Sequence, residues 1–308
     1  MADGQYGNAN VPKKALASQD IIYQASTLLS VAEKAGIPTK MANELTVKDD
    51  VVRGIKGEYD IDMTGELKPK RLAYTQLVAN MKWSEYTYDI LDKAKLDARD
   101  ETVLWKNAQV SAAEYFAAVK DYQILGGLSD ASMVSAAATA TWGSAGADPE
   151  TDIVNALSSI ADKSNAKDGE KISVVVPAKV FFEVNKLTLI NNIQRTVKDY
   201  LQQSFDLKIY SYRPPKDDAG TAYLDGLTTS ALVFVAGERT AAEYVYNPSV
   251  AASRGVPLVE HARVEGRGDT YIQKMAMTFM PVWDGLATFT SSSNYKTYRS
   301  YKITSVTT

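Results

Sequence analysis

The chain has 308 residues, a formal net charge of −3 at neutral pH and 45% hydrophobic residues. This composition is typical of a globular protein with a sizeable core, and it excludes a disordered or fibrous chain. The small net charge gives no field that argues for a nucleic acid or a membrane surface as partner. Because the sequence contains no cysteine, disulfides, thiolate metal sites and cysteine nucleophiles are excluded.

The first forty residues combine a polar arm with an amphipathic helix. Residues 1–11 are small and polar and lack the charged and apolar regions of a signal peptide, and no stretch of the chain approaches ~18 apolar residues. We therefore expect a protein that is neither secreted nor inserted in a membrane. Ser18 is a candidate N-cap for a helix that ends at Gly36 and Pro38. Its apolar face, which we expect to dock on the chain's own core or on a neighbouring or guest protein, includes Ile21, Ile22, Leu28 and Leu29.

Residues 51–83 are predicted to form a long β-hairpin. Apolar and β-branched residues mark a strand on either side of a turn region that contains Gly, Thr and Pro. The tip, Asp60 to Lys70, has few apolar residues to bury, so in a single subunit it would project into solvent. We therefore expect the hairpin to contact a partner subunit. The candidate contact residues are Ile55, Tyr59, Asp60, Asp62, Lys68, Lys70 and Arg71.

The longest helical pattern runs from Asp100 to Gln123 and predicts a spine for the fold. Apolar residues, Tyr122 among them, recur at steps of three and four, and Lys120 and Asp121 fall between them. Asp100 is the candidate N-cap, and Gly126-Gly127 lies just beyond the predicted end. At 1.5 Å per residue such a helix would be roughly 35 Å long.

The rest of the chain mixes helices with strands. Ser84 to Ala94 is predicted as a short helix with Ile90 and Leu91 facing inward, and Ser129 to Ala147 as an exposed loop or weak strand. Helices and buried strands alternate in the middle, where the apolar run Ile172 to Val176 predicts a buried strand, and the last third is mostly β. Tyr295 to Lys302 is predicted as a half-exposed terminal strand in preference to a base-stacking surface. This order of elements indicates an α+β fold.

Little in the sequence points to catalysis. His261 is the only histidine, which limits any Ser-His-Asp triad or multi-histidine metal site to one residue. No phosphate-binding or nucleophile-elbow motif occurs in a strand–turn–helix context. Asp60 to Gly65 begins like a calcium loop, but Arg71 stands where a bidentate Glu is needed. We assign no catalytic, cofactor-binding or metal-binding residue and expect no cofactor and no enzymatic activity.

The order of elements resembles that of the HK97-type shell proteins, the phage major capsid proteins and encapsulin nanocompartments. The resemblance covers about Ser18 to Thr290 and is one of pattern. The hairpin leading into SEYTYDILDKAK resembles the family's extended loop, and Asp100 to Gln123 resembles its spine helix. ISVVVPAKVFFEVNKL resembles the strand and short helix of the axial domain. VPLVEHARVEGRGDTYIQKMAMTFMPVWDGLATF resembles the closing strands of the peripheral domain.

The resemblance implies both an organisation and a function. The implied parts are an arm and helix (1–45), an extended hairpin loop (46–83), a peripheral domain with the spine helix (84–128), an axial domain (129–245), and a return to the β-rich peripheral region with a C-terminal tail (246–308). Residues 291–308 have no obvious counterpart in the family. The implied function is a structural subunit that self-assembles into a closed icosahedral shell around a cargo, either protein or DNA. Such a shell would lie in the cytoplasm as a particle or form a virion. Its pore-lining residues are unknown.

Two other classes of protein remain open on these residues. A phage tail or baseplate component would share self-assembly without forming a closed shell. An α+β enzyme or ligand-binding protein would need a deep pocket with a pair of carboxylates of raised pKa. The single histidine and the lack of cysteine count against an enzyme.

Overall fold

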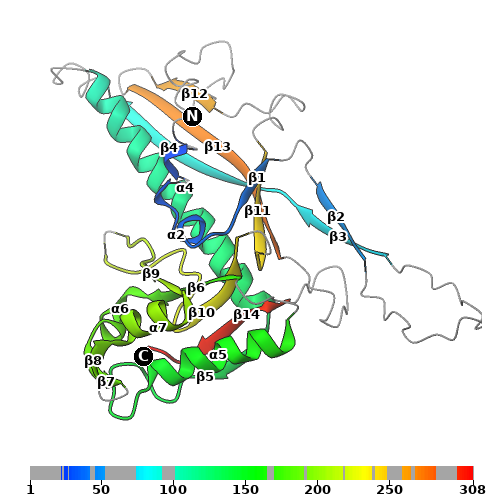
Figure 1. The fold of residues 1–308 in the computed structure, drawn as a ribbon. Coiled ribbons are helices and arrows are strands. Elements are labelled where there is room, and N and C mark those ends of the chain that lie inside the picture. The colour runs from blue at the N-terminus through cyan, green and yellow to red at the C-terminus, as the bar shows by residue number, and fades with distance from the viewer. Residues whose placement is uncertain are drawn as a thin grey trace, which may run out of the picture.

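The structure is a computed structural model, and it describes residues 22, 24–26, 28–41, 46–52, 74–91, 101–164, 170–190, 193–217, 219–237, 240–247, 259–264, 268–281 and 297–307. A long helix, α4 (Glu101–Ala131), crosses the molecule diagonally in Figure 1. One five-stranded sheet follows its first part, and a second five-stranded sheet lies at its other end. The fold is therefore α+β, as the order of elements predicted. No helix in the described part of the chain is long and apolar enough to cross a membrane.

The peripheral sheet lies along α4. Its strands run in the order β1 (Thr39–Met41), β11 (Ala242–Asn247), β13 (Gly268–Pro281) and β12 (Val259–Val264), and β4 (Lys82–Leu91) pairs with the other edge of β13. β13 is long enough to pair with three strands, antiparallel in each case. β1 is the exception in this sheet, because it pairs parallel to β11.

The axial sheet is the second five-stranded sheet. Its strands run in the order β5 (Ser132–Ala137), β14 (Thr297–Thr304), β10 (Ala231–Ala236), β6 (Lys171–Pro177) and β9 (Lys208–Tyr212). All six residues of β10 are buried, as expected for a strand in the centre of a sheet that is covered on both faces. The helices packed around this sheet are α5 (Pro149–Lys163), α6 (Ala178–Val184) and α7 (Val197–Phe205).

Two ribbons of two strands complete the described elements. β2 (Thr46–Val52) pairs antiparallel with β3 (Tyr74–Asn80), and β7 (Leu187–Ile190) pairs antiparallel with β8 (Ile193–Thr196). The first ribbon forms the base of the predicted hairpin, and residues 53–73 lie outside the described residues.

The spine helix is longer than the sequence pattern predicted. α4 continues through Gly126 and Gly127 and ends only at Ala131, so the prediction that this pair ends the helix was wrong. The pair provides a close contact instead. A Cβ added to Gly226 would lie 2.9 Å from the N of Gly126 and 3.0 Å from the O of Tyr122. The loop around Gly226 can therefore rest directly on the helix backbone, because no side chain separates them.

The buried face of α4 also differs from its predicted apolar face. Phe116, Leu125 and other apolar residues pack in the core between the helix and the two sheets, as the periodicity predicted. Lys120 and Asp121, predicted as polar positions between the apolar ones, are buried, whereas Tyr122 is 43% exposed. The difference arises because polar partners from a distant segment meet Lys120 and Asp121 inside the protein.

The predicted short helix before the spine is a strand. Residues 84–91 belong to β4, which pairs along its length with β13. Tyr86, Tyr88 and Ile90 alternate with exposed residues and face α4 and β13, and Leu91 is exposed. The alternation of aromatic and polar residues has the period of a strand, so the helical prediction for Ser84 to Ala94 was wrong.

The segment predicted as an exposed loop or weak strand, Ser129 to Ala147, divides into three parts. Its first three residues end α4, its next six form β5, and the remainder is a loop. Trp142 in that loop is buried. Its Nε1 donates to Oδ2 of Asp152 at 2.9 Å, and the N of Thr139 donates to Oδ1 of Asp152 at 2.9 Å. One carboxylate on α5 therefore fixes the loop after β5.

The C-terminal strand lies inside the axial sheet. β14 pairs antiparallel with β10 and parallel with β5, and the side chains of Thr297 and Ser300 are buried. The strand predicted over Tyr295 to Lys302 is confirmed for residues 297–302, whose side chains are buried or partly buried, but the local sequence does not show which strands flank it. The described strands of residues 246–308 accordingly divide between the two sheets.

Candidate functional site

The β2–β3 ribbon projects from the body of the molecule. Its register runs from Thr46 opposite Asn80 to Val52 opposite Tyr74. In the described part of the chain neither strand pairs with a third strand, and Figure 1 shows the ribbon pointing away from both five-stranded sheets. A two-stranded ribbon alone is only marginally stable in water.

The residues predicted to make contacts between subunits lie beyond this ribbon. Ile55, Tyr59, Asp60, Asp62, Lys68, Lys70 and Arg71 all fall within residues 53–73, outside the described residues. Their role as contacts stays a prediction.

The predicted docking residues of the N-terminal helix occupy different environments. Ile22 is buried in the core that contains Phe116 of α4. Leu28 and Leu29 are 74% and 44% exposed, and Ile21 lies outside the described residues. Ser30 interrupts the helix and caps a separate turn of helix, α2 (Val31–Lys34). The structure therefore puts one of the four side chains in the core and two on the surface.

A buried polar cluster, made by Ser30, Glu33, Thr39, Lys120 and Asp121, joins this N-terminal segment to α4. The carboxylate of Asp121 accepts hydrogen bonds from the Oγ of Ser30 at 2.7 Å and from the N of Ala32 at 2.9 Å. Its second oxygen accepts from the N of Val31 at 3.0 Å. Asp121 thereby supplies acceptors to the N–H groups that the first turn of α2 leaves free.

Lys120 adds an ion pair to the polar cluster. Its Nζ lies 3.1 Å from Oε1 of Glu33 and 5.8 Å from the ring centroid of Tyr244. The same Glu33 oxygen accepts a hydrogen bond from Oγ1 of Thr39. The side chains of Lys120 and Glu33 are 0% and 8% exposed. Removal of Lys120 would therefore leave the buried Glu33 carboxylate without this cation, which is costly.

Burial shifts both charged groups on α4 toward their neutral forms. Desolvation raises the pKa of Asp121, and the hydrogen bonds from the N-terminal segment oppose this shift. Desolvation lowers the pKa of Lys120, and the charge of Glu33 opposes it. The oxygens of Asp121 are engaged by donors of the same chain. The cluster is therefore built to hold a segment in place.

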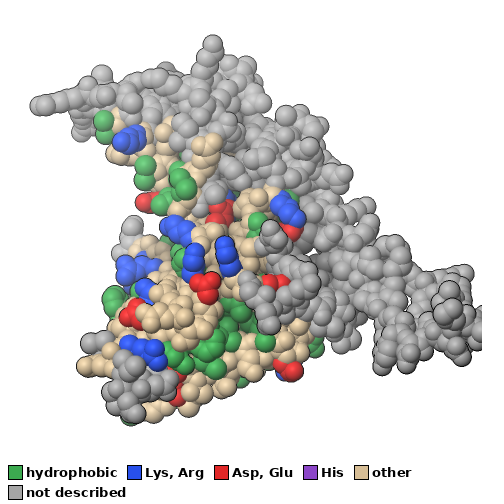
Figure 2. All heavy atoms as spheres, in the orientation of Figure 1, with side chains coloured by type: hydrophobic (Ala, Val, Ile, Leu, Met, Phe, Trp, Pro, Cys, Tyr) green, Lys and Arg blue, Asp and Glu red, His purple; other side chains and the backbone are tan. Residues whose placement is uncertain are grey.

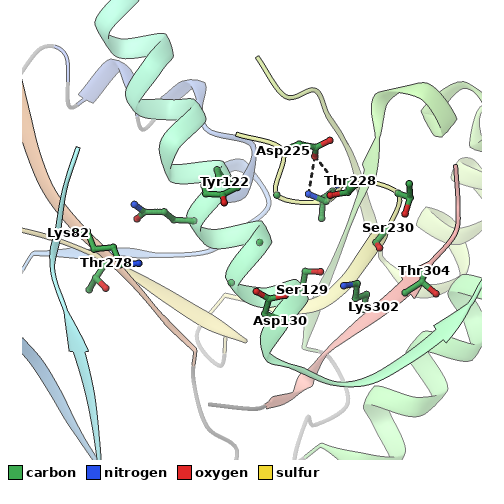
Figure 3. Close-up of a pocket in the computed structure, with 16 residues that line it drawn as sticks. Lys82, Tyr122, Ser129, Asp130, Asp225, Thr228, Ser230, Thr278, Lys302 and Thr304 are labelled. Carbon is green, nitrogen blue, oxygen red and sulfur yellow. Dashed lines mark hydrogen bonds between the residues drawn. The ribbon is translucent and has the colours of Figure 1, made fainter. Parts of the chain in front are cut away.

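A polar cavity of about 700 Å³ lies beside the C-terminal end of α4. Figure 3 shows Lys82 and Thr278 of the peripheral sheet on one side of α4 and Lys302 of the axial sheet on the other. Asp225 shapes the adjoining loop, because its Oδ1 accepts from the N of Thr228 at 2.8 Å. Hydroxyl and ammonium groups dominate the lining, so the cavity suits a polar segment.

A second, more apolar groove of about 400 Å³ lies beside the middle of α4. Its walls include Leu29, Ala117, Ala118, Pro214 and Pro215. On the face shown in Figure 2, basic side chains are interspersed with acidic and apolar ones in the described part of the chain. This surface therefore carries mixed charge.

The described residues contain no group of three or more His, Cys, Asp or Glu side chains that could hold a metal ion. The backbone of His261 lies in β12, opposite Tyr271 of β13. No local pattern in the sequence indicates the polar cluster, because its partners are about ninety residues apart along the chain.

The chain is similar to known proteins in structure. No protein-family model matches the sequence, and no curated protein matches it. A virus-like particle from Pyrococcus furiosus matches with a TM-score of 0.60 at 10% identity, over 94% of this chain and 98% of that one. A phage-related protein from Bordetella bronchiseptica matches with a TM-score of 0.59 at 11% identity, over 93% and 96%. The capsid of Myoviridae phage XM1 matches with a TM-score of 0.55 at 14% identity, over 90% and 91%.

These matches span nearly the whole of each chain, so they concern the complete arrangement of spine helix, peripheral sheet and axial sheet. The chain therefore has the α+β HK97-type fold of shell proteins, as the order of its elements predicted.

Proposed function

We propose that the chain is a structural subunit that self-assembles into a closed shell around a cargo. The observation that carries the proposal is the β2–β3 ribbon, which projects from the body and has no third strand beside it in the described part of the chain. A second copy lying against the ribbon would supply the missing cover. The likeness in fold to phage capsids and to a virus-like particle supports the same conclusion.

The contacts in this proposal come from the hairpin and from the exposed end of the N-terminal helix. Ile55, Tyr59, Asp60, Asp62, Lys68, Lys70 and Arg71 are the proposed hairpin contacts. Leu28, 74% exposed, and Leu29 are proposed to dock on a neighbouring subunit or a guest. The subunit has no catalytic role in this account, and the particle would be found in the cytoplasm or in a virion.

Replacement of the hairpin tip tests the proposal. In one variant residues 60–70 are replaced by a short Gly-Ser turn. We expect a folded subunit that no longer assembles, because the contact between copies is lost while both sheets are intact. Far-UV circular dichroism measures the fold, and size-exclusion chromatography measures assembly. The control is Lys186→Ala, which removes an exposed partner of Glu183. Normal assembly of the tip variant would contradict the proposed role of the hairpin.

The contents of the particle decide between the two kinds of cargo. Purified particles are treated with nuclease, then opened and examined by absorbance at 260 nm and by mass spectrometry. Protected nucleic acid would identify a DNA-packaging capsid. A co-purified protein in fixed ratio to the subunit would identify a protein compartment.

A further inference from the structure

We propose that the polar cluster is a positioning device for assembly: it holds residues 30–41 against α4 and so limits where β2, the first strand of the ribbon, begins, whereas β3 continues through Met81 into β4. Lys120 and Asp121 are the positioning residues, and they act through the N-terminal segment. This inference rests on the proposed shell function, because the direction of the ribbon affects function only if the ribbon contacts a second copy.

The segment after the polar cluster is hydrogen-bonded to both sheets. The Oγ of Ser173, in the axial sheet, donates to the O of Ala35 at 2.7 Å. The N of Tyr244, in the peripheral sheet, donates to the O of Pro38 at 3.0 Å. Gly36 between them has φ +94°, and a Cβ there would lie 2.9 Å from the Cβ of Ala236. This position of the turn therefore requires glycine, which has no Cβ and readily adopts a positive φ.

The polar cluster is linked to the ribbon through β1. Thr39 belongs to the cluster through its hydrogen bond to Glu33, and it is also the first residue of β1. β1 pairs parallel with β11, and Lys40 forms an ion pair with Glu243 beside it. Only residues 42–45 separate β1 from β2. At about 3.6 Å per residue, the ribbon must start within roughly 18 Å of Met41.

The contact between the N-terminal segment and α4 is buried and contains charged groups. An apolar contact could stabilise the docked segment equally well, since buried ion pairs contribute little net stability. It would not fix the orientation of the segment to the same degree. Three hydrogen bonds to the one carboxylate of Asp121 require the donors of residues 30–32 to lie at set positions. The polar cluster therefore selects one register for the segment on α4.

Three full-length variants test the inference. Lys120→Met leaves the buried Glu33 without its cation, and Lys120→Met with Glu33→Gln removes both charges at similar volume. Lys186→Met is the control, because it breaks an exposed pair with Glu183. Hydrogen exchange of residues 31–41 reports the attachment of the segment. The fraction of protein in particles, by size-exclusion chromatography and negative-stain imaging, reports assembly.

In Lys120→Met we expect exchange in residues 31–41 to be at least ~10-fold faster and the particle fraction to fall severalfold. The double variant should recover most of both, because Glu33 no longer carries an uncompensated charge and Asp121 keeps its hydrogen bonds from residues 30–32. Should Lys120→Met fail to fold, Asp121→Asn replaces it, since the amide keeps the volume and loses acceptor strength. Unchanged exchange would overturn the attachment.

Faster exchange with normal particles would overturn the role in assembly. A double variant as impaired as the single one would overturn the electrostatic cause. If the unsubstituted chain forms no particles, the proposed shell function fails, and the exchange measurements still decide whether the polar cluster holds the segment.

Discussion

At the scale of single residues, buried polar groups carry much of the specificity of this fold. Asp152 is the clearest case outside the polar cluster. It is buried on α5, and it accepts hydrogen bonds from the N and Oγ1 of Thr139 and from Nε1 of Trp142. These bonds give the loop after β5 a fixed conformation, although its sequence is rich in small residues.

We predict that Asp152→Ala lowers the free energy of unfolding by about 1 to 3 kcal/mol, because the buried indole N–H of Trp142 loses its acceptor and Thr139 loses its hydrogen bonds to α5. Urea unfolding followed by tryptophan fluorescence measures the change. Asp162→Ala, an exposed position on the same helix, is the control and should change stability by less than ~0.5 kcal/mol. Equal effects of the two substitutions would show that the loop does not depend on Asp152.

Buried tyrosines predict loss of stability in alkali. Burial raises the pKa of Tyr88 and of Tyr212 above the ordinary value of 10.0. The unfolded chain therefore releases these protons at lower pH than the folded chain. Their contribution is complete below about pH 10 and is lost as the pH rises toward the raised pKa values. Denaturation at successive pH values measures the free energy of unfolding, and absorbance at 295 nm measures ionisation of the tyrosines. A free energy of unfolding that stays constant to pH 12 would contradict this expectation.

At the scale of elements, the spine helix and a loop of the axial region meet through glycine. Gly226 has backbone atoms of α4 within about 3 Å of the position of its missing Cβ, whereas a Cβ on Gly126 would find its nearest atom at 3.6 Å. The two glycines are therefore not equivalent, although they touch each other.

We predict opposite effects of the two alanine substitutions. Gly226→Ala should destabilise the protein by about 1 to 3 kcal/mol, because the loop must move off the helix. Gly126→Ala should be neutral or should stabilise by up to ~1 kcal/mol, because alanine favours a helix interior. Thermal unfolding of both variants tests the pair. Destabilisation by Gly126→Ala as large as that by Gly226→Ala would mean that the helix itself needs glycine.

The elements also show how far sequence reasoning reaches. The 3.6-residue period identified α4, and the apolar run at Ile172 to Val176 identified β6, because both signals are local. β4 was mistaken for a helix although its aromatic and polar residues alternate with the period of a strand, and only its pairing with β13 makes the strand evident. The two neighbours of β14, β5 and β10, could not be predicted for the same reason.

The candidate site was harder to predict than the fold. The burial of Lys120 and Asp121 depends on Glu33 and Ser30, which lie 87 and 91 residues away. Single-sequence periodicity marks such positions as solvent-facing. The hairpin contacts predicted from composition lie in residues 53–73, outside the described residues, and stay predictions.

At the scale of the whole molecule, the proposed function depends on assembly of many copies of the chain. The chain has one long spine helix, a sheet beside it, a second sheet at its end and a ribbon that leaves the body. In the described part of the chain no third strand lies beside the ribbon, and symmetric copies could each cover the ribbon of a neighbour. In a closed shell, the ribbon of every copy can be covered by a neighbour.

The most direct test is the mass and shape of the purified full-length protein at neutral pH, by analytical ultracentrifugation and negative-stain imaging. We expect uniform, closed, hollow particles built from many copies. A monomer or small oligomer at every salt and protein concentration would contradict the proposed function, and open tubes or rings would indicate a tail or baseplate component instead.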